Sequence, residues 1–362
     1  MVAKETYQAP DAGIEAEGEV CIPFNAADQI EICYAKGWTD GLPVVPASTR
    51  AMEAMLDAAG LAGDEIVAEM PSRNVRLPAS IVAINAVMAG CLPEYMPVVV
   101  AAVKCLAHPE FGLHHVGAAH SGPTVGVIVN GPIGPELGIN AGDNLLGPGF
   151  RANATIGRAV RLVMLNCLNY RPGIADRATI GTSGKFTCCF AENEDASPWQ
   201  PLHVERGFPA EVSTVTLVAW STAMQVSLHG SAEQLLTAIA DALTFSGNLA
   251  LVGQTPGMVI FAGEHIETLK ADGWSKSQVK EFIVGNARRR VADLKRAGRL
   301  DGGIEAGDEE SWRYAMERPE DLIVLAAGGA SGAFSAVMPG FGSSKTAGRS
   351  RTIAIAPKGV KS

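Results

Sequence analysis

The sequence predicts an α/β protein with mixed sheets covered by helices. Hydrophobic residues make up 47% of the 362 residues, which is enough for a large core. The β-branched run 125–130 lies close to Gly-Pro steps on both sides, which indicates a buried strand. Residues 150–168 place arginines on one side and apolar residues on the other, which predicts an amphipathic helix.

The first part of the chain is expected to form an arm followed by helices. Residues 1–27 are acidic and rich in small residues, which predicts a loose N-terminal arm. Ser48 or Thr49 is expected to cap a helix that ends near residue 59. Other helices are expected at 28–36, 79–90, 96–107 and 150–168.

After residue 205 the alternation of strands and helices starts again. Strands are predicted at 212–219, 224–228, 258–262, 322–326 and 352–356. Helices are predicted at 232–244, 264–272 and 276–298. The segment 328–344 is rich in Gly and Ser, so we expect a flexible loop there that could close over a ligand or bind an anion. A disordered connector before the final strand explains it equally well.

The chain is therefore divided into two predicted lobes, 28–205 and 206–362. In each lobe a helix precedes a Val-Gly step and a buried strand, which ends at Asn130 in the first lobe and before Gly263 in the second. This repeated pattern predicts duplicated lobes, although chance similarity between ordinary α/β units explains it equally well. Duplicated α/β lobes often bind a ligand between them, at the carboxyl ends of strands.

Composition excludes two classes of partner. The formal net charge is −9 and no basic stripe is present, so nucleic acid is not expected to bind. The most basic run, Arg288–Arg290, is expected on the solvated face of the helix 276–298. The apolar stretch 80–103 is interrupted by Pro93 and Pro97, which predicts two buried helices rather than a membrane span.

The cysteines and the N-terminal residues indicate the cellular compartment in which the protein is expected. The seven cysteines show no disulfide spacing, which favours free thiols in a reducing cytoplasm. No basic start followed by an apolar run is present, so no signal peptide is expected. We therefore expect a cytoplasmic protein, and we expect it to be a homo-oligomer.

A polar, glycine-rich loop at 138–153 leads into the helix predicted at 150–168. Free backbone N–H groups and the positive end of a helix dipole suit a carboxylate or phosphate. Caps and turns explain the same residues equally well. On the functional interpretation, the side chains that bind the substrate are Asn130, Asn140, Asp143, Asn144, Arg151 and Asn153.

Candidate catalytic residues follow between 188 and 205. Cys189 is preferred over Cys188 as a reactive thiol, although a buried, inert cysteine is commoner. Glu192, if partly buried, is a candidate general acid or base rather than a surface charge. His203 and Glu205 are expected on the same side of an extended segment, where the carboxylate raises the basicity of the imidazole. A structural ion-pair cluster is the alternative.

Three histidines lie close together at 114, 115 and 120, beside a Gly/Ala-rich loop. Two of them, His115 and His120, could bind a divalent metal. Histidines that form hydrogen bonds in a loop, or one that acts as an acid or base, are the favoured alternative. Neither a Walker loop nor a dinucleotide fingerprint is present, so no nucleotide cofactor is expected.

Several long strings resemble a bacterial family of about this length. They include Gly-Trp-Thr-Asp-Gly-Leu-Pro at 37–43, and they span 37–46, 149–159, 191–194, 197–199 and 273–276. The similarity covers about 28–356. Members of that family are often encoded beside, or fused to, a small protein with a selenocysteine-or-cysteine, Gly, Ser, Cys motif, which this chain itself lacks. The resemblance implies a small thiol redox protein as partner, and it assigns no catalytic residue.

The residues together predict an enzyme that acts on a small anionic organic molecule by acid/base chemistry, of hydrolase or lyase type. Glu192, His203 and Glu205 would move protons, and Cys189 would serve as a nucleophile or metal ligand. The alternative is a substrate-binding subunit of a thiol or selenol redox system. A structural component of an oligomer, without a polar pocket, is the third hypothesis.

Overall fold

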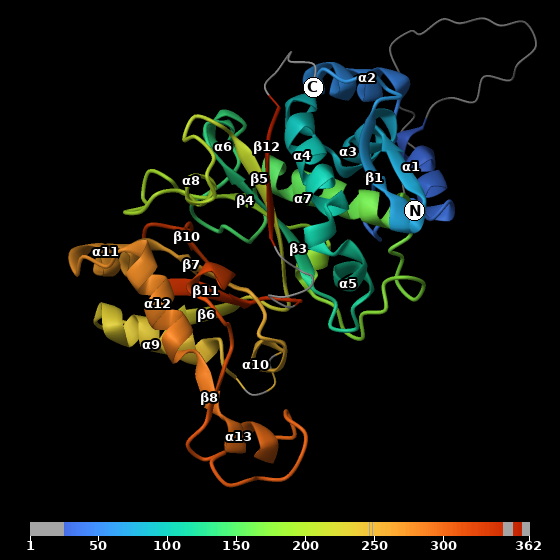
Figure 1. Cartoon of the computed structure of the whole chain (residues 1–362). Coiled ribbons are helices and arrows are strands. Elements are labelled where there is room, and N and C mark those ends of the chain that lie inside the picture. Colours follow the sequence, from blue (N-terminus) through green and yellow to red (C-terminus); the bar gives the residue numbers. More distant parts are fainter. Residues whose placement is uncertain (1–24, 246, 248, 343–349, 357–362) are drawn as a thin grey trace, which may run out of the picture.

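The computed structural model describes residues 25–245, 247, 249–342 and 350–356 (Figure 1). Two four-stranded sheets face one another, and helices cover the outer face of each, so the layers are helix, sheet, sheet, helix. The predicted α/β class with mixed, helix-covered sheets is confirmed. Most of the predicted arm 1–27 lies outside the described residues, and helix α1 (Ala26–Ala35) already begins within it.

The first sheet has the strand order β12-β5-β3-β4. Strand β3 runs parallel to β4, and the other two pairs are antiparallel. The side chains alternate: Val127 and Val129 pack against the helices, while Ile128 between them packs against the second sheet. The strands are β3 (Thr124–Asn130), β4 (Cys189–Ala191), β5 (Thr214–Trp220) and β12 (Arg351–Ala354).

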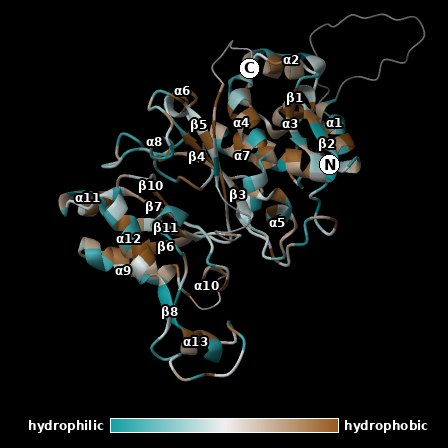
Figure 2. Ribbon diagram, in the orientation of Figure 1, coloured by the Kyte–Doolittle hydropathy of each residue, from teal (hydrophilic) through white to brown (hydrophobic). Residues whose placement is uncertain are grey.

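Apolar helices cover the outer face of the first sheet. Figure 2 shows hydrophobic residues along α4 and α7, which lie against this sheet. Helices α4 (Met96–Ala107) and α7 (Arg151–Asn166) contact the sheet, and α2 (Thr49–Ala59) and α3 (Ala79–Ala89) pack on them from outside. Helix α5 (Leu113–Ala118) adds side chains to the same core. A hairpin of β1 (Ile66–Met70) and β2 (Val75–Pro78) lies beside them.

The apolar stretch 80–103 forms α3 and α4, as predicted, and both helices are largely buried. Within the described ranges no single helix has the length and apolar composition to cross a membrane. One pair, Pro93–Ala107 with Pro109–Ala118, meets that test jointly but is bent by 70°.

The second sheet has the order β10-β7-β11-β6, again with one parallel pair, β7 and β10. Helices α9, α11 and α12 cover its outer face (Figure 1). The strands are β6 (Met224–Ser227), β7 (Gly257–Phe261), β10 (Leu322–Ala326) and β11 (Phe334–Pro339). The helices are α9 (Ala232–Ala242), α11 (Gly263–Ala271) and α12 (Lys276–Asn286), and short ones are α6 (Ile133–Glu136), α8 (Leu202–Glu205), α10 (Ala250–Gly253) and α13 (Val291–Arg296).

The helix predicted at 276–298 is wrong at 287–290, and helical structure resumes in α13. Helix α12 ends at Asn286, and Arg288–Arg290 form strand β8, which pairs with β9 (Trp312–Tyr314). The guanidinium groups of Arg288 and Arg290 lie 4.4 and 3.8 Å from the ring centroid of Trp312. Cation–π contacts to a distant tryptophan therefore outweigh the local helical pattern.

The flexible loop predicted over 328–344 is also wrong in part. Strand β11 occupies its middle and lies between β7 and β6 in the second sheet. Val337 and Met338 are fully buried on opposite faces of that sheet. The Gly and Ser residues before the strand obscured this short apolar alternation.

The sheets do not follow the predicted lobe boundary between 205 and 206, because β5 and β12 belong to the first sheet. In chain order, β3, β4 and β5 build most of the first sheet, and then β6 crosses to the second. Likewise β7, β10 and β11 build most of the second sheet, and then β12 crosses to the first. Each half of the chain thus completes the sheet of the other half.

The two crossovers meet and have matching hydrogen bonds. Trp220 and Gly340 form an isolated antiparallel bridge. Ser221 N donates to Pro339 O over 3.0 Å, and Phe341 N donates to Ala219 O over 3.2 Å. Interchanging the two halves of the chain converts each of these two hydrogen bonds into the other, so the pair is symmetric. The pattern is what a duplication would produce, and the duplication itself stays a prediction.

Replacing Gly340 with Ala should destabilise the fold. A Cβ at this position would lie 1.6 Å from the backbone oxygen of Pro256, so the neighbouring ends of β11 and β7 would have to move apart. We expect the free energy of unfolding to fall by roughly 1–3 kcal/mol in urea titrations, as for other overpacked sites. Gly303→Ala is the control, because a Cβ there meets nothing within 4 Å. Equal stability of the two variants would contradict the proposed role of this close approach.

Candidate functional site

The carboxyl ends of the parallel strands in the two sheets meet between the sheets (Figure 1). The segment after β4 reaches the end of β10, because Asn193 N donates to Ala326 O over 2.7 Å. The segment after β10 reaches the loop at 138–153, because Gly328 N donates to Ala141 O over 2.8 Å. Strand ends of both sheets therefore surround the polar residues that follow β3 and β4.

Four of these residues form what we call the Glu192 cluster: Asn130, Glu192, Glu194 and His203. Asn130 Nδ2 donates to Glu192 Oε2 over 2.6 Å and to Glu194 Oε1 over 3.0 Å. His203 Nδ1 lies 3.8 Å from Glu194 Oε1. The cluster thus contains two carboxyl groups, an amide and an imidazole, with Asn130 bound to both carboxyl groups and His203 beside Glu194.

Backbone groups hold the two carboxyl groups in place. Gly131 N donates to Glu194 Oε1 over 2.7 Å, and Leu202 N, at the start of α8, donates to Glu192 Oε2 over 2.8 Å. Gly131 has a φ of +84°, and a Cβ there would lie 2.8 Å from Ser213 Cα. Glycine is therefore required where β3 turns and presents its N–H to Glu194.

The cluster contains buried polar atoms without partners. Asn130, Glu192 and His203 are 1%, 5% and 0% exposed. Within the described part of the chain, Asn130 Oδ1, Glu192 Oε1 and His203 Nδ1 have no hydrogen-bond partner. An unpaired buried polar group costs about 1–3 kcal/mol. Three such atoms in one place therefore indicate a site that can accept hydrogen bonds from, or donate one to, another molecule.

The protonation states follow from these surroundings. Burial raises the pKa of Glu192, and the nearby charge of Lys276 opposes the rise without cancelling it. Glu192 therefore keeps its proton to a higher pH than an exposed glutamate. His203 Nε2 lies 3.3 Å from the carbonyl oxygen of Ala210, which can only accept a hydrogen bond. This contact favours the tautomer with its proton on Nε2 and a free lone pair on Nδ1.

Beside the cluster, Glu205 binds two buried lysines of α12. Lys276 Nζ lies 2.8 Å from Glu205 Oε2, and Lys280 Nζ donates to Oε1 of the same carboxylate. Burial acts to raise the pKa of Glu205, but the two ammonium groups lower it overall. The predicted extended segment with His203 and Glu205 on one side is wrong, because 202–205 form α8 and the two side chains bind different partners.

The loop at 138–153 binds mainly to itself. Asn140 and Asn153 exchange side-chain and backbone hydrogen bonds of 2.8 and 3.1 Å. Asn144 Nδ2 donates to Pro148 O over 2.7 Å, and Asp143 Oδ1 fills the space beside Gly329. The structure thus gives these predicted substrate-binding side chains the roles of turns and caps. The loop contacts β4 through Asn140 O, which accepts from Ala191 N over 3.1 Å, one residue before Glu192.

Arg151 does not point to the Glu192 cluster. Its Nε and Nη2 atoms donate to the backbone oxygen of Gly90 over 3.1 and 3.0 Å, at the end of α3. A carbonyl at a helix C-terminus is an acceptor with no partner inside the helix, so the arginine caps α3. The predicted clamp on an anion is therefore engaged elsewhere in the fold.

The two adjacent cysteines lie at the amino end of β4, away from Glu192. They line a cavity of about 440 Å³ together with Thr124, Trp220 and Thr222. Burial raises the pKa of Cys188 to about 12 and that of Cys189 well above the ordinary value of a thiol. Both cysteines therefore stay protonated at neutral pH, which disfavours the predicted role of Cys189 as a nucleophile.

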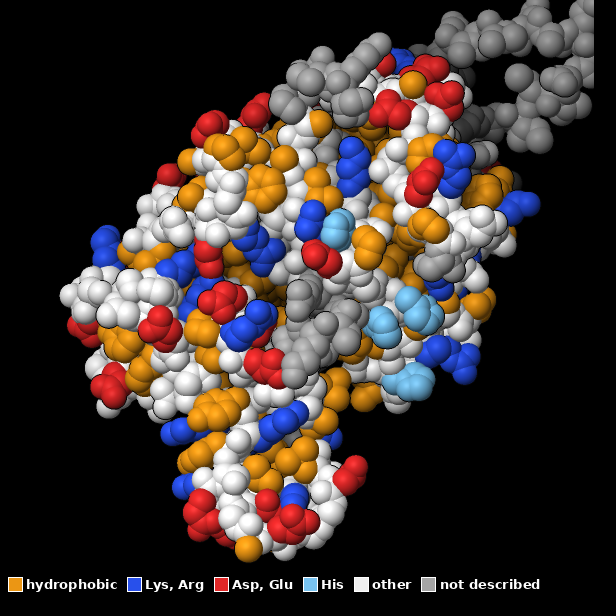
Figure 3. Space-filling model, in the orientation of Figure 1, with side chains coloured by type: hydrophobic (Ala, Val, Ile, Leu, Met, Phe, Trp, Pro, Cys, Tyr) orange, Lys and Arg blue, Asp and Glu red, His pale blue; other side chains and the backbone are white. Residues whose placement is uncertain are grey.

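The histidines predicted to bind metal lie on the surface. His115 belongs to the short helix α5 rather than to a loop, and His120 is exposed beyond its end. Figure 3 shows histidine side chains gathered over α5. Among the residues that the structure describes, no group of three His, Cys, Asp or Glu side chains could hold a metal ion. Among the described residues, the structure thus places no third metal ligand beside His115 and His120.

Sequence reasoning missed two members of this region, Glu194 and Lys276. Glu194 lies two residues after Glu192 in an extended segment, so both carboxyl groups can turn toward β3. That spacing could have identified it. Lys276 comes from α12, far along the chain, and no local pattern connects it with Glu192.

Replacing Glu192 with Gln should change how stability depends on pH. The pKa of Glu192 in the folded state lies above the value of about 4.3 in the unfolded state. The folded state therefore binds more protons, and wild-type stability falls as pH rises from about 4.3 through the raised pKa. The glutamine amide has no charge to bury, so the variant should gain stability relative to wild type over this window. A constant difference in urea unfolding from pH 4 to 8 would contradict the raised pKa.

Replacing Glu205 with Gln should act in the opposite direction. The variant leaves Lys276 and Lys280 buried without a carboxylate, which should cost about 1–3 kcal/mol at pH 7. Because the folded-state pKa of Glu205 is lowered, its stabilising effect is complete above about pH 4.3 and is lost as pH falls through the lower value. Glu281→Gln, on the exposed side of α12, is the control. An equal loss of stability in both variants would contradict the role of the ion pairs.

Comparison of the chain with models of protein families, with curated proteins and with solved structures finds no match. The family resemblance of 37–46 and the other strings, the small thiol redox partner that it implies, and homo-oligomeric assembly therefore stay predictions. The functional argument rests on the geometry of the Glu192 cluster.

Proposed function

We propose that this chain is an enzyme that acts on a small anionic organic molecule by acid/base chemistry at the Glu192 cluster. The observation that carries the proposal is the set of three buried, unpartnered atoms on Asn130, Glu192 and His203. A substrate that forms hydrogen bonds with these atoms offsets the free-energy cost of burying them unpaired. Part of the binding energy therefore acts at the groups that move protons.

The roles follow from the protonation states. Glu192 is the general acid, because burial raises its pKa and it keeps its proton to a higher pH than an exposed glutamate does. His203 Nδ1 is the general base, and Glu194 Oε1, 3.8 Å away, stabilises the imidazolium that forms. Asn130 orients the substrate through its free Oδ1. An acid and a base side by side suit elimination, in which one removes a proton and the other protonates the leaving group.

Charge and access support a small anion. Lys276 acts on Glu192 through its positive charge, so a negative group near the cluster is attracted. The side chain of Glu194 is 28% exposed and connects the buried atoms with solvent. The alternative function, a substrate-binding subunit of a thiol redox system, rests on the family resemblance alone.

The proposal is tested by proton exchange, which needs no knowledge of the full reaction. A panel of small β-hydroxy, β-amino and keto acids is incubated with the protein in D₂O, and NMR follows exchange of the hydrogen next to the carboxylate. Wild type should exchange at least one compound. His203→Gln should slow that exchange by about 10²–10⁴-fold, because the general base that removes this hydrogen is lost. Glu281→Gln should leave the rate unchanged.

A thermal-shift assay should still show the compound bound to His203→Gln. Glu192→Gln should keep the exchange but slow loss of the β-hydroxy or β-amino group by about 10²–10⁴-fold, because the general acid is lost. Loss of that group from Glu192→Gln at the wild-type rate would contradict the assignment of the acid. The absence of exchange for every member of the panel would contradict the proposed function.

A further inference from the structure

A surface groove remote from the Glu192 cluster carries more positive than negative charge. It has a volume of about 670 Å³ and lies between the turn 39–41, helix α7 and the loop 172–186. Thr182, in its wall, forms a 2.7 Å hydrogen bond with Thr124 at the start of β3. Asn130 ends the same strand, so the groove and the cluster are about 20 Å apart along β3.

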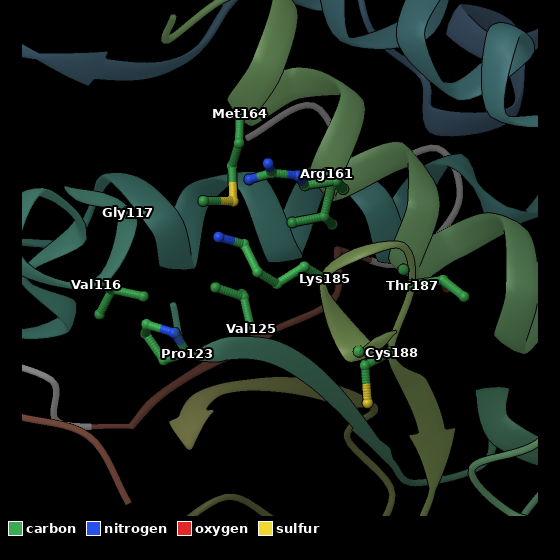
Figure 4. Close-up of a pocket in the computed structure, with 12 residues that line it drawn as sticks. Val116, Gly117, Pro123, Val125, Arg161, Met164, Lys185, Thr187 and Cys188 are labelled. Atoms are coloured by element: carbon green, nitrogen blue, oxygen red, sulfur yellow. The ribbon is translucent and has the colours of Figure 1, made fainter. Parts of the chain in front are cut away.

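Three ionised side chains of the groove, Arg161, Asp176 and Lys185, are bound to one another. Asp176 is 4% exposed and accepts from Arg161 Nη2 over 2.9 Å and from Lys185 Nζ over 2.7 Å. These cations and Ala178 N together lower the pKa of Asp176 despite its burial. Figure 4 shows Arg161 and Lys185 reaching toward the same space beside Met164, where a small pocket of about 20 Å³ has room for one water.

The charges do not cancel. Arg161 and Lys185 carry two positive charges and Asp176 carries one negative charge. Asp40, also in the groove wall, is neutralised by Arg158, which binds both of its oxygens over 2.8 and 2.9 Å. One positive charge therefore remains in the groove, on a chain whose formal net charge is −9.

Arg161 also has hydrogen-bond donors to spare. In the described part of the chain, its hydrogen bond to Asp176 uses one N–H of the guanidinium group. Its remaining N–H groups are not among the buried atoms that lack partners, so they face space that a ligand or water can enter. A planar guanidinium with free N–H groups suits a carboxylate, which it can bind through two parallel hydrogen bonds.

The rim of the groove is apolar and uncovered. Ile180 is 96% exposed and Phe186 is 46% exposed, and both line the groove. Single exposed apolar side chains are common, but two on the rim of one charged groove indicate a surface that an apolar group covers. The volume falls in the range of small-molecule sites.

The residues of the Gly-Trp-Thr-Asp-Gly-Leu-Pro string build one wall of the groove and are fixed to α7. Arg158 Nη2 donates to the backbone oxygens of Leu42 and Pro43, and Asn166 Nδ2 donates to the backbone oxygen of Trp38 over 3.0 Å. Because three positions of the string are held by one helix, the wall is pre-formed rather than assembled by a ligand.

We infer that this groove binds a small amphiphilic monoanion, a carboxylate carried on an apolar chain or ring. The carboxylate pairs with the free N–H groups of Arg161 and neutralises the remaining positive charge. The apolar part covers Ile180 and Phe186. This site does not depend on the acid/base function proposed for the Glu192 cluster, and its failure would leave that proposal untouched.

The test uses four probes in isothermal titration calorimetry with the full chain. Octanoate carries both required features, whereas acetate lacks the apolar part, 1-octanol lacks the charge, and octylamine has the opposite charge. Octanoate should bind saturably with one site per chain, and each of the other three should bind at least about tenfold more weakly. Equal binding of 1-octanol would show apolar adsorption, and equal binding of octylamine would exclude the charge argument.

Two variants locate the site. Arg161→Lys keeps the charge but loses the planar fork, and it should weaken octanoate binding by about tenfold while Asp176 keeps two cations. Ile180→Ser changes a side chain that is almost fully exposed, so the fold is retained, and it should also weaken binding. Ile304→Ser, at a 49% exposed position outside the groove, is the control. Octanoate binding that is absent in wild type, or unchanged in both groove variants, would overturn the inference.

Discussion

The backbone bridge between Trp220 and Gly340 is the contact on which the arrangement of the two sheets depends. The chain crosses from one sheet to the other on both sides of this bridge. Neither sheet is complete without a strand from the other half, because β6 belongs to the second sheet and β12 to the first. Leu217 in β5 pairs with Arg351 only after almost the whole chain has been made. Such non-local pairing makes folding slow and strongly cooperative.

The apolar core between the two sheets holds the strands rigidly, and the polar site lies at the ends of these strands. Ile128 and Phe190 from the first sheet pack with Met258, Ile260 and others from the second. Their strand neighbours point outward to the helices, so each of these strands is buried on both faces. With β3 and β4 fixed in this way, the residues at their carboxyl ends have little freedom. The Glu192 cluster can therefore keep unpaired atoms that a looser framework would cover by rearrangement.

Local patterns in the sequence predicted most helices and strands, since apolar periodicity over a segment needs no knowledge of its partners. The predictions failed where a distant group decided the outcome, as for Arg288–Arg290, which stack on Trp312 and form a strand. The predicted lobe boundary failed for the same reason. The hydrophobic pattern of a strand does not show which of the two sheets the strand joins. Among the site residues, Asn130 and Glu192 come together at the carboxyl ends of the parallel strands β3 and β4, and His203 lies beside Glu194 from helix α8. The polar residues of 138–153 instead satisfy one another, and no sequence pattern distinguishes an Asn that closes its own loop from one that binds a ligand.

The matched registers of the two sheets allow the Glu192 cluster to be compared with the same place in the second sheet. Val129 pairs with Val215 and Ala191 in the first sheet as Phe261 pairs with Ser335 and Ala326 in the second. The residues that follow these strands therefore correspond: Asn130 to Ala262, and Glu192 to Ala327. Glu192 N donates to Val129 O just as Ala327 N donates to Phe261 O, so the backbones agree as well. Alanine at both positions completes the second sheet, whereas the first carries a buried carboxyl and amide with unpaired atoms. A costly polar pair at one of two equivalent sites is better explained by chemistry performed there than by stability.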